Sequence, residues 1–224
     1  MSKLRIPAIV GVISSRDDLH RATRLRKPPD LFELRLDALA RNLHELEKTI
    51  DQLGAALIIT ARHPAEGGKN NLRTRERRAL LLRFLPHADY VDIEMRSAKT
   101  LADVLKEAQT RRVRTILSFH DLRGTPTEKR LEEIAKGAKS FKPDVIKVAT
   151  RLDNDSQLDR LRAFFLLHKS KHIAVMGLGR LGRQSRIEFA AGGSALTYAH
   201  LGTPQDEGQL SLQDLRRRLA RKFL

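Results

Sequence analysis

The chain has 224 residues, a length suited to one domain that spans residues 1–224. It contains no cysteine, which excludes disulfide frameworks, thiolate metal sites and cysteine nucleophiles. Its 43 Lys and Arg residues against 27 Asp and Glu residues give a formal charge of +16, and such a field attracts nucleic acid, anionic membranes or acidic small molecules.

Apolar runs rich in Val, Ile and Leu alternate with amphipathic stretches along the chain. The runs predict eight strands, at residues 8–14, 31–39, 56–62, 90–95, 114–119, 144–150, 172–178 and 195–201. Apolar residues three and four apart predict helices at residues 75–84, 99–109, 128–138, 155–168, 185–192 and 212–223. This alternation indicates parallel strands with right-handed crossovers and favours a single (β/α)8 TIM barrel. An open doubly wound sheet is the alternative, since closure is not visible in a sequence.

The segments near the two ends of the chain each carry a pattern that bears on function. The first apolar run is too short to span a membrane and is more typical of a strand than of a signal peptide, so we expect a soluble cytoplasmic protein. The last predicted helix carries a basic cluster beside Leu212, Leu215, Leu219 and Phe223. We interpret that cluster as the solvated face of a terminal helix, with an RNA-binding surface as the alternative.

Two residues that can do chemistry lie in neighbouring predicted strands. Lys147 sits between Ile146 and Val148, and burial would penalise its charge and favour the neutral amine, a nucleophile toward carbonyls. A lysine at a strand end that reaches solvent is an equally weighted alternative. His120 follows the strand before it and suits both acid and base duty near neutral pH. In a barrel both would lie on one rim, where active sites are found.

Charged residues also occur inside strands that should be apolar. Glu33, Arg35 and Asp37 share one face of their strand, opposite to Leu34 and Leu36. They predict a buried ion pair, a clamp for a hydroxylated substrate, or both.

A second group of charges follows on the next two strands. Arg62 ends its strand, and Asp92 and Glu94 share a face of the following one. These two carboxylates could bind a divalent metal, but we favour a role in orienting the basic side chains inside the same barrel.

The segment 176–186 contains Gly177, Gly179 and Gly182 in the pattern GxGxxG after a strand. It follows the seventh strand rather than the first, and no acidic residue follows where a dinucleotide site would need one. We therefore interpret it as an anion site at a helix N-terminus, with Arg180, Arg183 and Arg186 nearby.

Taken together, these motifs resemble the type I 3-dehydroquinate dehydratases. The resemblance rests on ordered fragments along nearly the whole chain: ELRLD (33–37), TARHPAEGG (60–68), DIE (92–94), SFHD (118–121), DVIKVAT (144–150), MG…SR (176–186), GSALTYA (193–199) and Gln209. It implies a lyase that converts 3-dehydroquinate to 3-dehydroshikimate and water, the third step of chorismate synthesis in the shikimate pathway.

The resemblance also implies roles for individual residues. Lys147 would form a Schiff base with the substrate ketone, His120 would transfer protons, and Glu66 would orient His120. The binding residues would be Glu33, Arg35 and Arg62 for the ring hydroxyls, Arg186 for the carboxylate, Gln209 on the closing loop and Met176 beside the ring. No metal or organic cofactor is needed, because the lysine supplies the electron sink. The family implies a homodimer.

The sequence departs from the family pattern in two places. The stretch from Met176 to Arg186 is two residues longer than the family form, so Arg183 is the alternative carboxylate ligand. The loop 203–209 carries Asp206 and Glu207, which would either weaken substrate binding or face solvent.

Three other functions fit part of the sequence. A transaldolase-type class I aldolase also uses a strand lysine, and the glycine- and arginine-rich segment could hold its phosphate. A nucleic-acid-binding protein would suit the charge, but eight Phe, two Tyr and no Trp offer few stacking surfaces. A barrel that keeps the lysine but has lost turnover through its altered loop is the third.

Overall fold

A computed structural model of the chain describes residues 7–169 and 172–222. Within these residues eight strands are present: β1 (Ala8–Ile13), β2 (Leu31–Arg35), β3 (Ala56–Thr60), β4 (Tyr90–Glu94), β5 (Arg114–Asp121), β6 (Val145–Arg151), β7 (Ile173–Leu178) and β8 (Leu196–His200). Each predicted strand is therefore confirmed. The second is shorter than predicted, because the chain turns away from the sheet after Arg35.

A helix follows each strand. The helices are α1 (Arg16–Thr23), α2 (Leu43–Thr49), α3 (Thr74–Phe84), α4 (Ala102–Thr110), α5 (Glu128–Lys139), α6 (Asp155–His168), α7 (Gly182–Ala191) and α8 (Leu212–Lys222). Short 3-10 helices are η1 (Ile50–Gln52), η2 (Pro64–Glu66), η3 (Leu85–His87) and η4 (Met95–Ser97). The six predicted helices are confirmed, whereas α1 and α2 were not predicted. These two have eight and seven residues, about two turns, which is too short for a clear apolar period.

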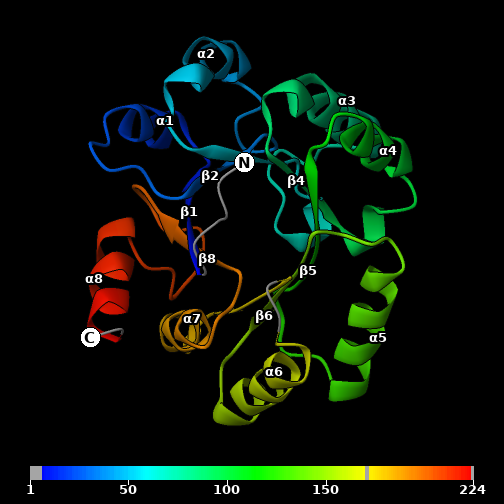
Figure 1. Ribbon diagram of the computed structural model, residues 1–224, viewed down its shortest axis with the longest axis vertical. Coiled ribbons are helices and arrows are strands. Elements are labelled where there is room, and N and C mark those ends of the chain that lie inside the picture. The colour runs from blue at the N-terminus through cyan, green and yellow to red at the C-terminus, as the bar shows by residue number, and fades with distance from the viewer. Residues whose placement is uncertain (1–6, 170–171, 223–224) are drawn as a thin grey trace.

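The strands form one parallel sheet with the order β7-β6-β5-β4-β3-β2-β1-β8. The sheet curls so that its end strands meet, and the backbone N–H of Ala195, just before β8, donates to the carbonyl of Ile173 in β7 at 2.7 Å. The helices surround the strands as an outer ring (Figure 1). The fold is thus the predicted (β/α)8 barrel rather than an open sheet.

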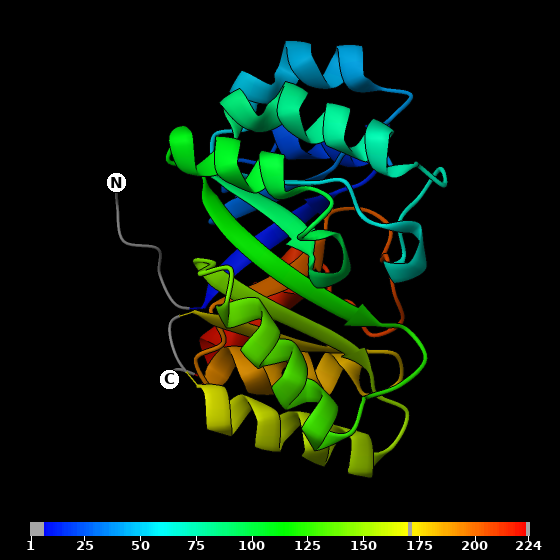
Figure 2. The same ribbon diagram turned by 90° about the vertical axis from the view of Figure 1, so that its right-hand side faces the viewer.

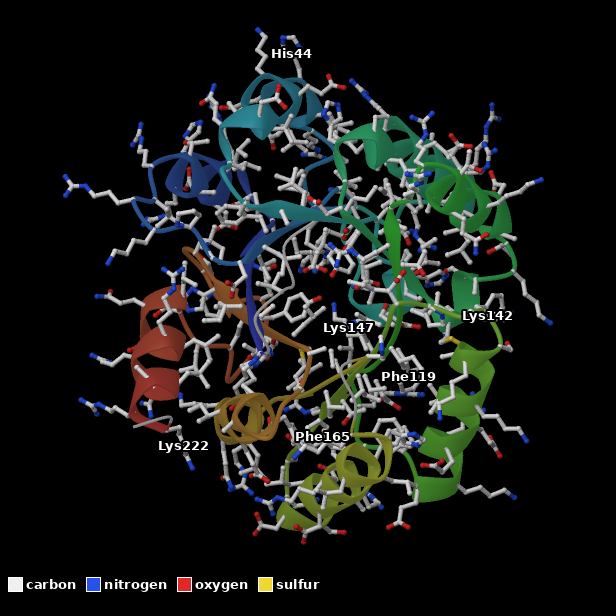
Figure 3. The ribbon with its side chains drawn as sticks, in the orientation of Figure 1. His44, Phe119, Lys142, Lys147, Phe165 and Lys222 are labelled. Carbon is white, nitrogen blue, oxygen red and sulfur yellow. The ribbon has the colours of Figure 1, made fainter. Side chains whose placement is uncertain are left out.

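The alternation of side chains along each strand divides the core into two parts. Outward residues such as Leu34, Ile59 and Val148 pack beneath the helices, and inward residues such as Leu31, Ile58 and Tyr90 fill the barrel. Figure 3 shows Lys147 near the middle of the ring, whereas Lys142 and Lys222 lie at its periphery. Lys147 therefore occupies the interior face of β6.

The last helix matches its interpretation as an amphipathic terminal helix. Leu212, Leu215 and Leu219 are buried, and Arg217 and Arg221 are exposed. Phe223, predicted to complete the apolar face, lies outside the described residues. Among the helices that the structure describes, none is long and apolar enough to cross a membrane.

Candidate functional site

A cavity of about 270 Å³ opens at the carboxyl ends of the strands. The strand arrowheads point toward this side of the barrel in Figure 2. All nine site residues predicted from the sequence line the cavity: Glu33, Arg35, Arg62, Glu66, His120, Lys147, Met176, Arg186 and Gln209. The fold thus brings together side chains from five strands or strand ends, one 3-10 helix, one α-helix and one loop.

Lys147 on β6 lines the cavity and is buried, with its residue 3% exposed. Its Nζ atom donates a hydrogen bond to Oδ2 of Asp92 at 3.0 Å and lies 3.6 Å from Oε1 of Glu33. The ring of Tyr198 lies against the same nitrogen, and the distance from Nζ to the ring centroid is 4.1 Å. Tyr198 was not predicted from the sequence, although it alternates with Thr197 and Ala199 so as to face inward on β8.

Asp92 links Lys147 to a buried arginine. Arg62 donates to both carboxylate oxygens of Asp92, at 3.0 and 2.9 Å, and also to Oγ of Ser118 at 2.6 Å. Burial opposes ionisation of Asp92, yet Arg62 and Lys147 hold the pKa of this carboxyl well below its ordinary value. Asp92 therefore carries a negative charge that both buried cations contact.

Glu94 continues this charged network toward the helix layer. One oxygen accepts from Arg62 at 3.3 Å and from the backbone N–H of His63 at 2.9 Å, and the other accepts from Arg77 of α3. Arg77 is 1% exposed and was missed in the sequence, where its only sign is a position in helical register with Leu81 and Phe84. The described residues contain no acidic or histidine cluster arranged to hold a metal ion, and Asp92 and Glu94 face cations instead.

His120 on β5 is held by Glu66 through two hydrogen bonds. Oε2 of Glu66 lies 3.0 Å from Nδ1 of His120 and accepts from the backbone N–H of the same residue at 3.0 Å. Burial lowers the pKa of His120 well below its ordinary value, and Arg62 and Lys147 lower it further. The imidazole is thus neutral at neutral pH. When ionised Glu66 accepts from Nδ1, Nε2 is left as the basic nitrogen.

The Glu-Gly-Gly sequence positions Glu66 for this contact. Gly67 ends η2 at φ +86°, a backbone conformation that favours glycine. At Gly68 a Cβ atom would lie only 2.1 Å from the carbonyl oxygen of Arg62, so no side chain fits there. Burial raises the pKa of Glu66 to about 7, although Arg62 opposes the rise. This carboxyl therefore titrates near neutral pH.

Arg35 lies at the rim, with its side chain 11% exposed. It donates to both oxygens of Asp37, at 3.0 and 2.9 Å, and to the carbonyl of Gly67 at 3.1 Å. Leu34 and Leu36 pack in the outer core, as the alternation predicted. The ion pair expected on this strand is present, and Arg35 also faces the cavity.

The segment 176–186 differs from the anion site expected there. Arg186 of α7 lines the cavity, Arg183 is exposed, and Arg180 donates to the carbonyl of Asp153. The N-terminus of α7 is covered by backbone: a Cβ on Gly182 would lie 3.1 Å from the carbonyl of Glu207, and one on Gly208 would lie 2.9 Å from the amide of Arg183. The loop before α8 therefore packs against the N-terminus of α7, and of the three arginines expected at the anion site only Arg186 lines the cavity.

The sequence offered Arg186 and Arg183 as ligands of a substrate carboxylate, and of these two only Arg186 lines the cavity. Its residue is 2% exposed, and its Nη2 donates to both oxygens of Asp206, at 3.1 and 2.8 Å. Its Nε atom and Oη of Tyr198 are buried without a hydrogen-bond partner among the described residues. Buried polar groups normally have partners, so these two atoms favour a polar ligand in the cavity.

Comparison with known proteins places the chain among related barrels. The family model for type I 3-dehydroquinase matches residues 8–222. The 3-dehydroquinate dehydratase of Thermococcus gammatolerans is 36% identical over 214 residues, 94% of this chain and 97% of that relative. The one from Thermodesulfovibrio yellowstonii is 32% identical over 214 residues, 94% of this chain and 93% of that relative. A crystal structure of 3-dehydroquinate dehydratase from Geobacillus kaustophilus matches with a TM-score of 0.85 at 25% identity, covering 96% of this chain and 90% of that one.

Proposed function

Since the chain belongs to the type I 3-dehydroquinase family and is therefore a hydro-lyase, we propose that it dehydrates 3-dehydroquinate to 3-dehydroshikimate through a Schiff base on Lys147. The observation that carries this proposal is the position of Lys147. Its amine is buried at the floor of the cavity, next to Asp92 and the ring of Tyr198, and His120 lies on the adjacent strand.

Lys147 supplies the electron sink of the reaction. Its Nζ attacks the ketone carbon of the substrate, and loss of water leaves an iminium ion. The positive nitrogen withdraws electrons from the neighbouring C–H bond and makes its proton removable. Asp92, ionised and only 3.0 Å away, lies where it can stabilise the cation that forms.

His120 moves the protons. Ser118 is the register partner of Lys147, so His120 sits two residues nearer the cavity mouth on the adjacent strand. Its neutral imidazole takes the proton next to the iminium to give an enamine, and the resulting imidazolium returns that proton to the departing hydroxyl. Hydrolysis of the iminium then releases the product and restores the amine, so the net reaction is loss of one water.

The remaining lining residues suit a hydroxylated ring acid. Glu33, Arg35 and Arg62 present hydrogen-bonding groups to ring hydroxyls, Arg186 offers a guanidinium to the carboxylate, Gln209 approaches from the loop and Met176 packs beside the ring. The aldolase alternative would need a phosphate site, and the turn that could have provided it is covered by the backbone of Glu207 and Gly208.

Borohydride trapping tests the proposal. The protein is mixed with 3-dehydroquinate and sodium borohydride, and its intact mass is measured before the modified peptide is identified. We expect an adduct on Lys147 with the mass of the dehydrated ligand. An adduct that retains the water would show a competent lysine and a failed elimination, and the absence of any adduct would refute the Schiff-base mechanism. Lys142→Ala is the matched control, because this lysine is exposed at the periphery (Figure 3).

We propose further that the enzyme works as a cytoplasmic homodimer in the shikimate pathway. The family implies this role and this assembly. To test the role, the protein is expressed in a strain that lacks its own 3-dehydroquinate dehydratase. Growth of this strain without aromatic amino acids would support the proposal. Light scattering would test the assembly, and a monomer mass at micromolar concentration would contradict it.

A further inference from the structure

The arginine proposed to bind the substrate carboxylate already holds a carboxylate of its own chain. Nη2 of Arg186 donates to Oδ1 and Oδ2 of Asp206, at 3.1 and 2.8 Å. Both residues line the catalytic cavity, and the side chain of Asp206 is 24% exposed. Asp206 thus occupies a position at Arg186 where an acidic substrate would place its own charged group.

The loop that carries Asp206 engages a second binding group as well. Oε1 of Gln209 accepts a hydrogen bond from the backbone N–H of Gln205 at 2.6 Å. Gln209 is 8% exposed and lines the same cavity. Two side chains proposed to bind the substrate, Arg186 and Gln209, are therefore already in contact with consecutive residues of the segment 203–209, Asp206 and Gln205.

A substrate carboxylate that bound Arg186 would meet Asp206 at this place. The cavity holds about 270 Å³, and two carboxylates at one guanidinium inside it would repel each other. Burial raises the pKa of Asp206 above its ordinary value even though Arg186 opposes the rise, so the charged carboxylate is partly desolvated where it contacts the arginine. A partly exposed carboxylate on a surface loop can regain that hydration when it leaves.

We propose that Asp206 is an internal stand-in for the substrate carboxylate, so that substrate binds only by displacing Asp206 from Arg186. This inference rests on the proposed function. Asp206 would then lower the affinity of the site for substrate, because the ion pair between Arg186 and Asp206 must break before the substrate carboxylate can bind Arg186. Glu207, the next residue, is 64% exposed at its side chain, which pairs with Arg151 at 3.8 Å and does not contact Arg186 among the ion pairs of the described residues.

The test compares Asp206→Asn with Glu207→Gln, two changes that remove one negative charge from adjacent positions. The probe is quinate, which carries the same carboxylate and has a hydroxyl in place of the ketone, so that its binding involves no imine. We expect calorimetry to give a Kd for Asp206→Asn lower by on the order of tenfold, because the lost hydrogen-bonded ion pair no longer competes. Glu207→Gln should stay within about twofold of the unmodified protein.

Hydrogen exchange of the free proteins provides a second readout that needs no ligand. Backbone amides in residues 203–209 should exchange faster in Asp206→Asn than in the unmodified protein, and at an unchanged rate in Glu207→Gln. Weaker quinate binding by Asp206→Asn, or equal effects of the two variants, would overturn the proposal. If quinate binds to none of the proteins and borohydride traps no adduct, the proposed function fails. The exchange rates alone then decide whether Asp206 holds the loop, and unchanged rates refute it.

Discussion

Oδ2 of Asp92 accepts hydrogen bonds from two buried cations, Lys147 at 3.0 Å and Arg62 at 2.9 Å. All three side chains are less than 5% exposed. One carboxylate is therefore shared by the proposed nucleophile and the arginine beside it, and Glu33 and Glu94 supply further negative charge next to them. This arrangement couples the stability of the barrel interior to its chemistry.

Replacing Asp92 should destabilise the protein strongly. Asp92→Asn leaves Arg62 and Lys147 facing each other in the barrel with less compensating charge, and we expect a loss of about 3–5 kcal/mol in the free energy of unfolding. Urea denaturation measures it. Asp103→Asn is the control, because its pair with Arg78 is roughly half exposed and should contribute less than about 1 kcal/mol. Equal losses in the two variants would contradict a structural role for the buried pair.

Removing the imidazole of His120 should separate imine formation from elimination. We expect His120→Ala to lower kcat by about 10²–10⁴-fold, because proton transfer loses its acid and base. Borohydride should still trap an adduct on Lys147, now with the water retained. His44→Ala is the control, since His44 is exposed at the edge of the molecule (Figure 3). Near-normal turnover in His120→Ala would remove this residue from the mechanism.

The activity should depend on pH through Glu66. Its pKa is raised to about 7, so it ionises as pH rises through that value and then accepts the Nδ1 proton of His120, which makes Nε2 a stronger base. We expect kcat/KM to increase through an inflection near pH 7. In Glu66→Gln this inflection should disappear, and the remaining one should lie below 6.5, where His120 itself is protonated. An inflection that persists near 7 in the variant would assign it to another group.

Arg186 and Arg183 should differ in their effect on substrate binding. Arg186 faces the cavity and Arg183 is exposed. Arg186→Ala should raise KM by about tenfold to a hundredfold, because charge-assisted hydrogen bonds to the carboxylate are lost. Arg183→Ala should leave KM within about twofold. Steady-state kinetics of both variants checks this, and the reverse result would show that the loop is arranged differently around the substrate.

Local patterns in the sequence were enough to predict the strands and the direction of their side chains. Glu33 and Arg35 face inward while Leu34 and Leu36 pack outward, because alternation along a strand depends only on the backbone of that strand. The predicted strand at 31–39 ends earlier, at Arg35, because the apolar residues after it continue into the outer core without continuing the sheet. The short helices α1 and α2 went unpredicted because two turns carry little periodicity.

The sequence by itself determined the kind of barrel and which residues could meet at its carboxyl end. Only the tertiary structure decided which of them touch. Asp92 and Lys147 are 55 residues apart, and Tyr198 reaches Lys147 from the strand that closes the barrel onto β1. The tertiary structure also decided the contact between Arg186 and Asp206, which are twenty residues apart. It likewise decided that the backbone at Gly208 packs against Gly182 at the start of α7. Such contacts depend on strand register, closure and the packing of loops, which arise from interactions between distant segments and leave no period in the sequence.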